Sequence, residues 1–154
     1  MTILVFSDSH GSTYSIDTIL EQEARVDSII FCGDIARDAD YIREYYPMIP
    51  LYAVRGNNDF YCDDPYLLMP ELDGVRIYIT HGHRERVKFG LHELAAHCRK
   101  NNCVLGLFGH THSPFNAEVG GVQLVNPGSI RSSHGTYSRI KINHGSFTVE
   151  NLSL

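Results

Sequence analysis

Short apolar runs alternate with polar segments along the first third of the chain. Residues 3–6 are four consecutive apolar residues, a pattern typical of a strand that is buried on both faces of its sheet. Similar runs predict strands over 27–32 and 51–54, and apolar residues at helical spacing predict helices over 13–24 and 38–46. The order strand, helix, strand, helix, strand is typical of a parallel βαβαβ unit.

The rest of the chain predicts a more varied arrangement. Residues 60–72 contain two prolines and three acidic residues, and this composition predicts a loop. Beyond it, the pattern predicts a helix over 90–100 and strands over 75–79, 104–108, 122–125, 137–142 and 147–152. Turn residues at 120–121 and 143–145 separate the last segments, as in β-hairpins. We therefore predict an α/β fold with mixed sheets, in a single domain that spans residues 1–154.

Composition and charge exclude several classes of function. The 154 residues are 43% hydrophobic and 20% charged, as in an ordinary globular domain, and the net charge of −5 is not the basic footprint of a nucleic-acid-binding protein. No apolar run approaches the roughly 20 residues that span a membrane, and no signal-peptide pattern is present. The four cysteines lack CxxC spacing, which favours free thiols. We expect a cytoplasmic protein with no membrane partner, and homo-oligomer formation stays open.

Five of the predicted strands end in polar clusters. These clusters are Asp8-Ser9-His10, Gly33-Asp34, Gly56-Asn57-Asn58-Asp59, His81-Gly82-His83 and Gly109-His110-Thr111-His112. Taken singly, each has a structural explanation: Asp8 can cap the following helix, and Gly33-Asp34 can form an ordinary turn. Because open α/β sheets carry their sites at the carboxyl ends of strands, five such clusters together point to one shared site.

The residue types in these clusters are those that bind transition metals. Carboxylate, amide and imidazole ligands suit Mn²⁺, Fe²⁺, Zn²⁺, Ni²⁺ or Co²⁺, and do not resemble a structural zinc site built from thiolates. The candidate ligands are Asp8, His10, Asp34, Asn57, His81, His110 and His112. Seven ligands are too many for one ion with an open position, and suit two ions about 3.5–4 Å apart, as in two-metal phosphoester hydrolysis. We expect two divalent transition-metal ions, with Mn²⁺ as the first candidate.

The order of these motifs resembles the signature of the calcineurin-like metallophosphoesterase family. The resemblance spans nearly the whole chain, and the short length and the segment Asn126-Pro127-Gly128-Ser129 are similar to the minimal bacterial and archaeal phosphodiesterase branch. It implies two facing mixed sheets flanked by helices, a four-layer αββα sandwich. It also implies hydrolysis of a small phosphodiester substrate by a hydroxide that bridges two metal ions.

The resemblance also implies which residues hold each metal, with Asp34 as the bridging carboxylate. One metal would be held by Asp8, His10, Asp34 and His112, and the other by Asp34, Asn57, His81 and His110.

Two further positions and one departure concern catalysis. The family commonly carries a histidine directly after the metal-binding asparagine, thought to protonate the leaving group, and this chain has Asn58 there. Asparagine can donate a hydrogen bond, to a phosphate oxygen for example, but cannot supply a proton. His83 is the candidate for a substitute acid or a phosphate contact, with a surface loop histidine as the alternative. Arg131 is a candidate phosphate contact, and a solvated arginine is the simpler interpretation.

We therefore predict a metal-dependent phosphodiesterase, and two other functions remain as alternatives. One is a phosphomonoesterase or protein phosphatase of the same fold. The absence of an inserted cap for a large substrate, and the presence of Asn58, count against it. The other is a non-catalytic scaffold like the retromer subunit of this fold, which has lost parts of the metal constellation. This chain retains all seven ligand types, which favours an enzyme.

Overall fold

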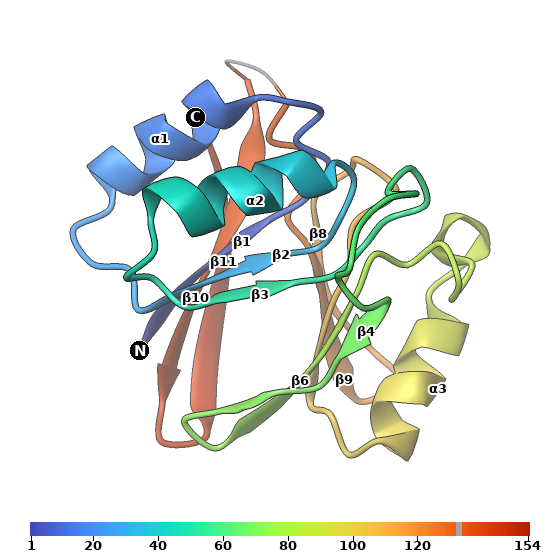
Figure 1. Cartoon of the computed structure of the whole chain (residues 1–154). Coiled ribbons are helices and arrows are strands. Elements are labelled where there is room, and N and C mark those ends of the chain that lie inside the picture. The colour runs from blue at the N-terminus through green and yellow to red at the C-terminus, as the bar shows by residue number, and fades with distance from the viewer. Residues whose placement is uncertain (132–133) are drawn as a thin grey trace.

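The structure is a computed structural model that describes residues 1–131 and 134–154 of the chain. Two β-sheets face each other, and helices cover their outer faces (Figure 1). The first sheet has the order β11-β10-β1-β2-β3. Its strands are β1 (Thr2–Phe6), β2 (Ser28–Phe31), β3 (Leu51–Ala53), β10 (Thr136–Asn143) and β11 (Ser146–Ser153).

The second sheet has six strands in the order β4-β6-β7-β9-β8, with β5 paired to β6. Its strands are β4 (Leu67–Leu68), β5 (Glu71–Leu72), β6 (Val75–Thr80), β7 (Leu105–Leu107), β8 (Phe115–Val119) and β9 (Val122–Asn126). Each sheet contains three parallel strands: β1, β2 and β3 in the first, and β6, β7 and β9 in the second. Antiparallel strands lie on one side of the parallel set in the first sheet and on both sides in the second, so the predicted mixed sheets and the βαβαβ unit are confirmed.

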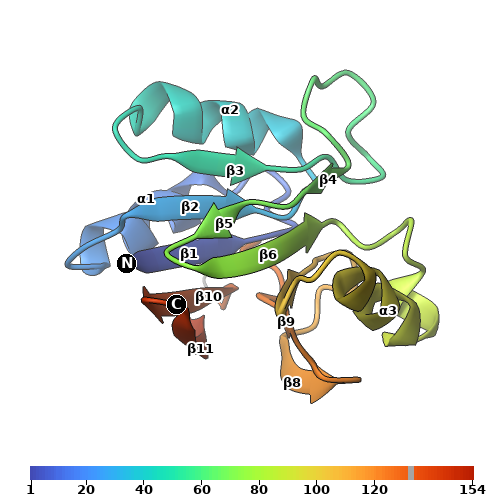
Figure 2. The ribbon, with the colours of Figure 1, turned by 90° about the horizontal axis from the view of Figure 1, so that it is seen from below.

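Three helices complete four layers. The helices α1 (Thr13–Gln22) and α2 (Ala36–Tyr45) cover the first sheet, and α3 (His92–Lys100) lies against the second (Figure 2). The sequence of β1 is apolar from Ile3 to Phe6 because both faces of this strand are buried. Ile3 and Val5 pack between the sheets, whereas Leu4 and Phe6 pack beneath the helices, because successive side chains of a strand point to opposite faces. Burying each such side chain contributes about 1.5–3 kcal/mol.

The structure corrects the sequence-based elements in three places. The predicted loop over 60–72 contains β4 and β5, because Leu67 and Leu68 pair with β6. Strands of two residues are too short to show a periodic pattern. β8 was not predicted, and it pairs in register with β9. A 3-10 helix at Val87–Phe89 precedes α3, which therefore begins at His92 rather than at residue 90.

Two further expectations can be compared with the described part of the chain. The four cysteines are free thiols, as predicted, and three of them are buried. Among the described residues, no helix is long and apolar enough to cross a membrane.

Candidate metal site

The five polar clusters meet at one end of the sandwich. Three follow β1, β2 and β3 of the first sheet, and two follow β6 and β7 of the second. Backbone hydrogen bonds tie neighbouring clusters together: Asp8 donates to the Gly33 carbonyl at 3.0 Å, and Gly109 donates to the His81 carbonyl at 3.0 Å. Residues from distant parts of the chain therefore share one edge of the fold, as the parallel strand order requires.

Much of the backbone of these clusters lies in the left-handed region. Five of the seven candidate ligands have positive φ: 52° at Asp8, 48° at His10, 55° at Asp34, 67° at His110 and 58° at His112. Residues other than glycine rarely adopt this conformation, which costs about 1–3 kcal/mol where the surroundings impose it. Such strain gathers at functional sites because a fixed geometry is needed there.

Two groups of three side chains converge within metal-binding reach. The ligand atoms of Asp8, His10 and His112 all lie within 4.8 Å of one another, and so do those of Asp8, Asp34 and His81. Within the first group, Asp8 Oδ1 lies 3.0 Å from His112 Nε2. Asp8 belongs to both groups, whereas the family resemblance gave the shared position to Asp34. The two groups together form one continuous cluster of candidate metal-ligand atoms, joined at Asp8.

His81 connects the second group to Asn57. Its ring is fully buried, and Nδ1 lies 2.7 Å from the Cys32 carbonyl oxygen. A carbonyl can only accept, so Nδ1 carries the hydrogen in the neutral ring and Nε2 presents a lone pair. Nε2 faces Asn57 Oδ1 at 3.1 Å and Asp34 Oδ1 at 3.8 Å. Three electron-rich atoms that point toward one another suit a cation between them.

His110 completes the set of seven. Its ring centroid lies 5.0 Å from that of His81, and its backbone N–H donates to Asp8 Oδ2 at 3.0 Å. Burial, with smaller contributions from the neighbouring His81 and Lys88, lowers the pKa of His110 to about 4. The imidazole is therefore neutral near pH 7, the form that binds metals.

One oxygen of the Asp8 carboxylate, Oδ1, is a buried atom without a hydrogen bond among the described residues. Asp8 is fully buried, and burial raises the pKa of its carboxyl, against the opposing effects of His81, Ser7 and His112. Ser7 Oγ donates to Oδ2 at 2.6 Å, but among the described residues Oδ1 has no hydrogen-bond donor. An unsatisfied buried oxygen costs about 1–3 kcal/mol, and a bound cation would satisfy it. The donor set therefore fits divalent metal ions.

Glycine is required where two of the clusters approach each other. A Cβ on Gly56 would lie 2.1 Å from Asp34 Oδ1, and one on Gly109 would lie 1.9 Å from Ser7 Oγ. Both distances are far shorter than any real contact, so a larger residue would displace a candidate ligand or its hydrogen-bond partner. The glycines that accompany the ligands in the sequence are therefore explained by close packing.

Three supporting residues were not assigned a role from the sequence. Asp59 accepts hydrogen bonds from the backbone N–H groups of Asp34 at 3.1 Å, Ala36 at 2.7 Å and Gly56 at 2.7 Å. It therefore joins the second cluster to the third. Its place in the Gly-Asn-Asn-Asp cluster was the available signal.

The other two supporting residues lie in the Asn126-Pro127-Gly128-Ser129 segment. Asn126 Nδ2 donates to the Gly109 carbonyl at 2.8 Å, and Ser129 Oγ donates to the Asp8 carbonyl at 2.7 Å. This segment therefore holds the backbone of the loops that carry Asp8 and His110.

The three residues with predicted roles in catalysis or substrate binding differ in how closely they contact the candidate ligands. Asn58 donates to Asp34 from its backbone N–H at 3.1 Å and from its side chain at 2.7 Å. The His83 ring lies 5.5 Å from the His81 ring, and burial and then His81 lower the pKa of His83. Arg131 is exposed, and its backbone N–H donates to Ser129 Oγ at 3.4 Å. Their roles stay predictions.

The family model for the calcineurin-like phosphoesterase superfamily domain matches residues 1–145. The chain belongs to this superfamily. It is 34% identical over 133 residues to the probable metallophosphoesterase YsnB of Bacillus subtilis. This match covers 85% of this chain and 76% of YsnB. It is 28% identical over 152 residues to the phosphodiesterase MJ0936 of Methanocaldococcus jannaschii, covering 83% of each chain.

Solved structures of this superfamily's fold agree with the architecture. A crystal structure of a predicted phosphoesterase from Streptococcus pneumoniae has a TM-score of 0.83 and 30% identity, covering 99% of this chain and 88% of that one. Wild-type Vps29 of Entamoeba histolytica, crystallised with Zn²⁺, has a TM-score of 0.78 and 20% identity, covering 99% of each chain. At that identity, the likeness to Vps29 is one of fold alone.

Proposed function

We propose that this metallophosphoesterase is a phosphodiesterase that works with two divalent metal ions. The observation that carries the proposal is the convergence of metal-ligand atoms: Asp8 Oδ1 has no hydrogen-bond partner among the described residues, and His81 Nε2 faces oxygens of Asn57 and Asp34. Oxygen and imidazole donors in two adjoining groups are the arrangement of two-metal phosphoester hydrolysis.

The seven candidate ligands divide between two ions in this proposal. Asp8, His10 and His112 would hold one ion, and Asp34, Asn57, His81 and His110 the other. Either Asp34 or Asp8 can provide the carboxylate shared between them. Mn²⁺ is our first choice, and Ni²⁺, Fe²⁺, Zn²⁺ and Co²⁺ suit the same donors. Bound ions would supply an acidified water as the nucleophile and would neutralise charge on the phosphoryl oxygens.

The chain's own side chains position these groups and the substrate. Asn58 holds Asp34 in one orientation through two hydrogen bonds, and it has no proton to give to a leaving group. His83 lies beside both His81 and His110, at 5.5 and 6.1 Å between ring centroids. Because the pKa of His83 is lowered, we assign its ring as a phosphate contact, and Arg131 as an outer phosphate contact.

The alternatives differ in what they require of the site. Asn58 stands where the family commonly carries a catalytic imidazole, and we take this substitution to disfavour monoester hydrolysis. A non-catalytic scaffold needs no reaction at all. Since a Vps29 of this fold was crystallised with Zn²⁺, metal binding does not distinguish a scaffold from an enzyme. Catalysis does.

The test compares esters on protein that has been stripped with EDTA and reloaded with Mn²⁺. We expect the metal-loaded protein to hydrolyse bis(p-nitrophenyl) phosphate faster than p-nitrophenyl phosphate, and the stripped protein to hydrolyse neither. The Asn58→His variant should gain monoester hydrolysis relative to diester hydrolysis. A wild-type preference for the monoester would establish a phosphomonoesterase. Tight metal binding by calorimetry with no hydrolysis of either ester would establish the scaffold.

A further inference from the structure

Two arginines and a tyrosine form a compact group beside the candidate metal site. Arg55 directly precedes Gly56 at the end of β3, and Arg84 directly follows His83 beyond β6. Both guanidinium carbons lie 4.7 Å from the centroid of the Tyr66 ring. Tyr66 lies in the segment between β3 and β4. We call Arg55, Tyr66 and Arg84 the Arg-Tyr-Arg group. The two sheets thus each contribute one arginine to it.

This group borders the candidate ligands. The Tyr66 ring lies 5.7 Å from the His83 ring, and His83 in turn lies 5.5 Å from His81. One imidazole therefore separates the group from a residue of the metal site. Arg84 also contributes to lowering the pKa of His83, although burial and His81 contribute more.

The two guanidinium groups are not neutralised by the protein. Among the residues that the structure describes, salt bridges engage Arg25, Arg43 and Arg139, and join neither Arg55 nor Arg84 to a carboxylate. This is unexpected in a chain with a net charge of −5.

The neighbouring acidic and polar groups do not supply a counter-ion either. The carboxylate of Glu85, next to Arg84 in the chain, is buried and accepts from Tyr78 at 3.3 Å and Thr80 at 2.9 Å. Among the described residues, the Arg55 side chain donates to the backbone carbonyls of Asp59 at 2.7 Å and of Phe60 at 3.5 Å. Two positive charges beside one ring therefore remain available to a ligand.

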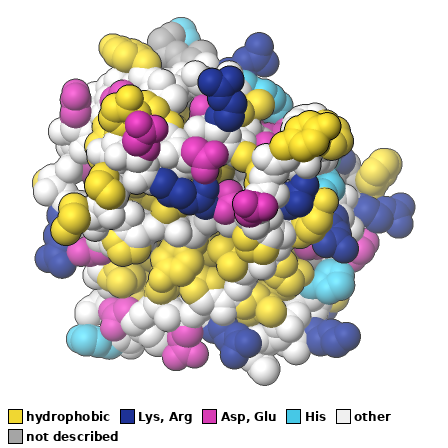
Figure 3. Space-filling view, in the orientation of Figure 1, with side chains coloured by type: hydrophobic (Ala, Val, Ile, Leu, Met, Phe, Trp, Pro, Cys, Tyr) yellow, Lys and Arg dark blue, Asp and Glu magenta, His cyan; other side chains and the backbone are white. Residues whose placement is uncertain are grey.

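There is space beside the group for the remote part of a substrate. Tyr66 and Arg84 line a cavity of about 360 Å³ together with Leu67, Tyr78, Glu85, His97 and Asn101. In the space-filling view, Lys and Arg side chains gather at the right-hand edge of the molecule, over the segment between β6 and α3 (Figure 3). The cavity therefore has a basic side chain, Arg84, in its lining.

We propose that Arg55 and Arg84, held by Tyr66, bind a second anionic group of the diester substrate, a terminal phosphate. Guanidinium groups bind phosphate through paired, charge-assisted hydrogen bonds, and stacking on an aromatic ring holds them ready for it. The inference rests on the proposed phosphodiesterase function and names its substrate class: phosphodiesters that carry a terminal phosphate monoester. A diester without that group lacks the interaction.

The test uses two dinucleotides that differ only in this group, dithymidylate with a 5′-phosphate (pTpT) and without it (TpT). With Mn²⁺ present, we expect wild-type kcat/KM for pTpT to exceed that for TpT by about tenfold or more, since a charge-assisted hydrogen bond contributes about 1.5–3 kcal/mol. Arg55→Gln and Arg84→Gln should each reduce this ratio, chiefly through KM for pTpT. Arg25→Gln, which removes a salt-bridged arginine before β2, is the matched control and should keep the wild-type ratio.

The outcomes separate this inference from the proposed function. Hydrolysis of both dinucleotides with equal kcat/KM would overturn the terminal-phosphate site and leave the phosphodiesterase assignment intact. If neither is hydrolysed, the phosphodiesterase assignment fails. Calorimetric binding of the two dinucleotides to metal-free protein then tests whether the terminal-phosphate site exists. Tighter binding of pTpT than of TpT, lost in Arg84→Gln but not in Arg25→Gln, would then support the inference. Equal binding of the two would refute it.

Discussion

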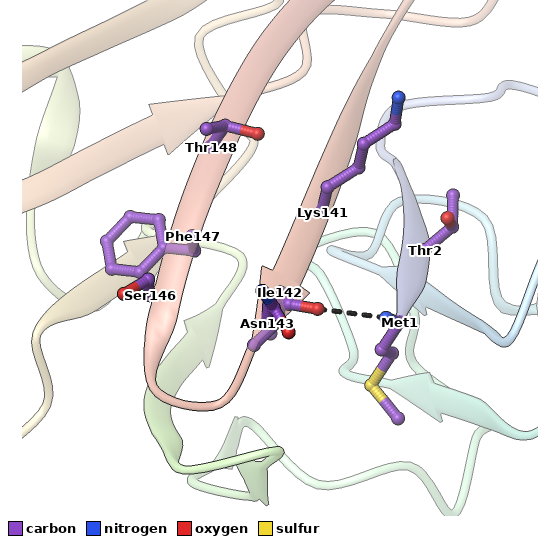
Figure 4. Close-up of a pocket in the computed structure, with 8 residues that line it drawn as sticks. All are labelled: Met1, Thr2, Lys141, Ile142, Asn143, Ser146, Phe147 and Thr148. Atoms are coloured by element: carbon purple, nitrogen blue, oxygen red, sulfur yellow. Dashed lines mark hydrogen bonds between the residues drawn. The ribbon is translucent and has the colours of Figure 1, made fainter.

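The two ends of the sandwich differ in whether strained backbone coincides with side-chain atoms that lack a partner among the described residues. The end opposite the metal site has a cavity of about 270 Å³, lined by Met1, Thr2, Lys141, Ile142, Asn143, Ser146, Phe147 and Thr148 (Figure 4). There the ammonium group of Met1 donates to the Ile142 carbonyl at 2.8 Å. Asp73 and His144 also have positive φ, but they lie in turns, and Asp73 Oδ2 accepts from the His144 N–H at 2.9 Å.

At the metal-site end, strained residues coincide with donors that lack partners. Asp8 has positive φ and a buried oxygen without a donor among the described residues, and Asp34 and His81 direct further lone pairs toward the same space. The comparison teaches that a cavity is a weak indicator of function in this fold. Strain together with unsatisfied polar atoms is a stronger one, because the protein retains both only where a ligand compensates for them.

The largest expected difference between the two ends concerns activity. Asp34→Asn removes a carboxylate that borders both His81 and Asn58, and we expect it to weaken metal binding and diester hydrolysis by more than about 100-fold. Asp73→Asn changes a carboxylate at the opposite end and should leave hydrolysis unchanged. Metal content and kcat/KM for bis(p-nitrophenyl) phosphate measure both effects. Equal losses in the two variants would show that the comparison between the ends is wrong.

Removal of metal should affect stability next most strongly. A ligand that binds only the folded state at 100 times its dissociation constant contributes about 2.7 kcal/mol. We expect Mn²⁺ to raise the thermal midpoint of wild type and EDTA to reverse the effect, as followed by circular dichroism. The Asp73→Asn variant should show the same Mn²⁺-dependent shift, whereas Asp34→Asn should show little. A shift that survives Asp34→Asn would place the stabilising ion elsewhere.

A pair of glycine substitutions separates steric crowding at the site from backbone strain. In Gly109→Ala, the new methyl group would collide with Ser7 Oγ and press on Asp8, so metal affinity should fall by about tenfold or more. In Gly145→Ala, the methyl group has space, but φ of +87° costs about 1–2 kcal/mol of stability. Calorimetric metal titration and urea unfolding distinguish the two. Normal metal affinity in Gly109→Ala would contradict the close-packing explanation.

The smallest predicted effect has opposite signs at the two ends. In metal-free protein near pH 7, Asp8→Asn removes a buried carboxylate whose Oδ1 lacks a donor, so we expect the free energy of unfolding to rise by about 1 kcal/mol. Asp73→Ala removes an acceptor that already has a partner and should lower the free energy of unfolding by about 1 kcal/mol. Urea unfolding in EDTA measures both. A less stable Asp8→Asn variant would show that the carboxylate is satisfied in the metal-free protein.

Much of the fold could be predicted because the parallel strands are apolar on both faces. The runs at β1, β2 and β7 stand out without any knowledge of their neighbours, and the order of strands and helices constrains how they connect. The strands that were missed, β4, β5 and β8, are short or largely exposed. They exist because β6 and β9 offer free edges to them, which is a property of the folded molecule.

For the candidate site, the amino-acid sequence is enough to predict which side chains lie at the metal-site end. Each cluster follows its own strand, so its position is a local property of the chain. Tertiary structure alone decided how these side chains are shared: Asp8 borders both groups of ligands, Asn58 donates to Asp34, and Arg55 meets Arg84 across Tyr66. These contacts join residues from separate strands and loops. Their distances depend on how the two sheets pack, and hydrophobic periodicity carries no record of that packing.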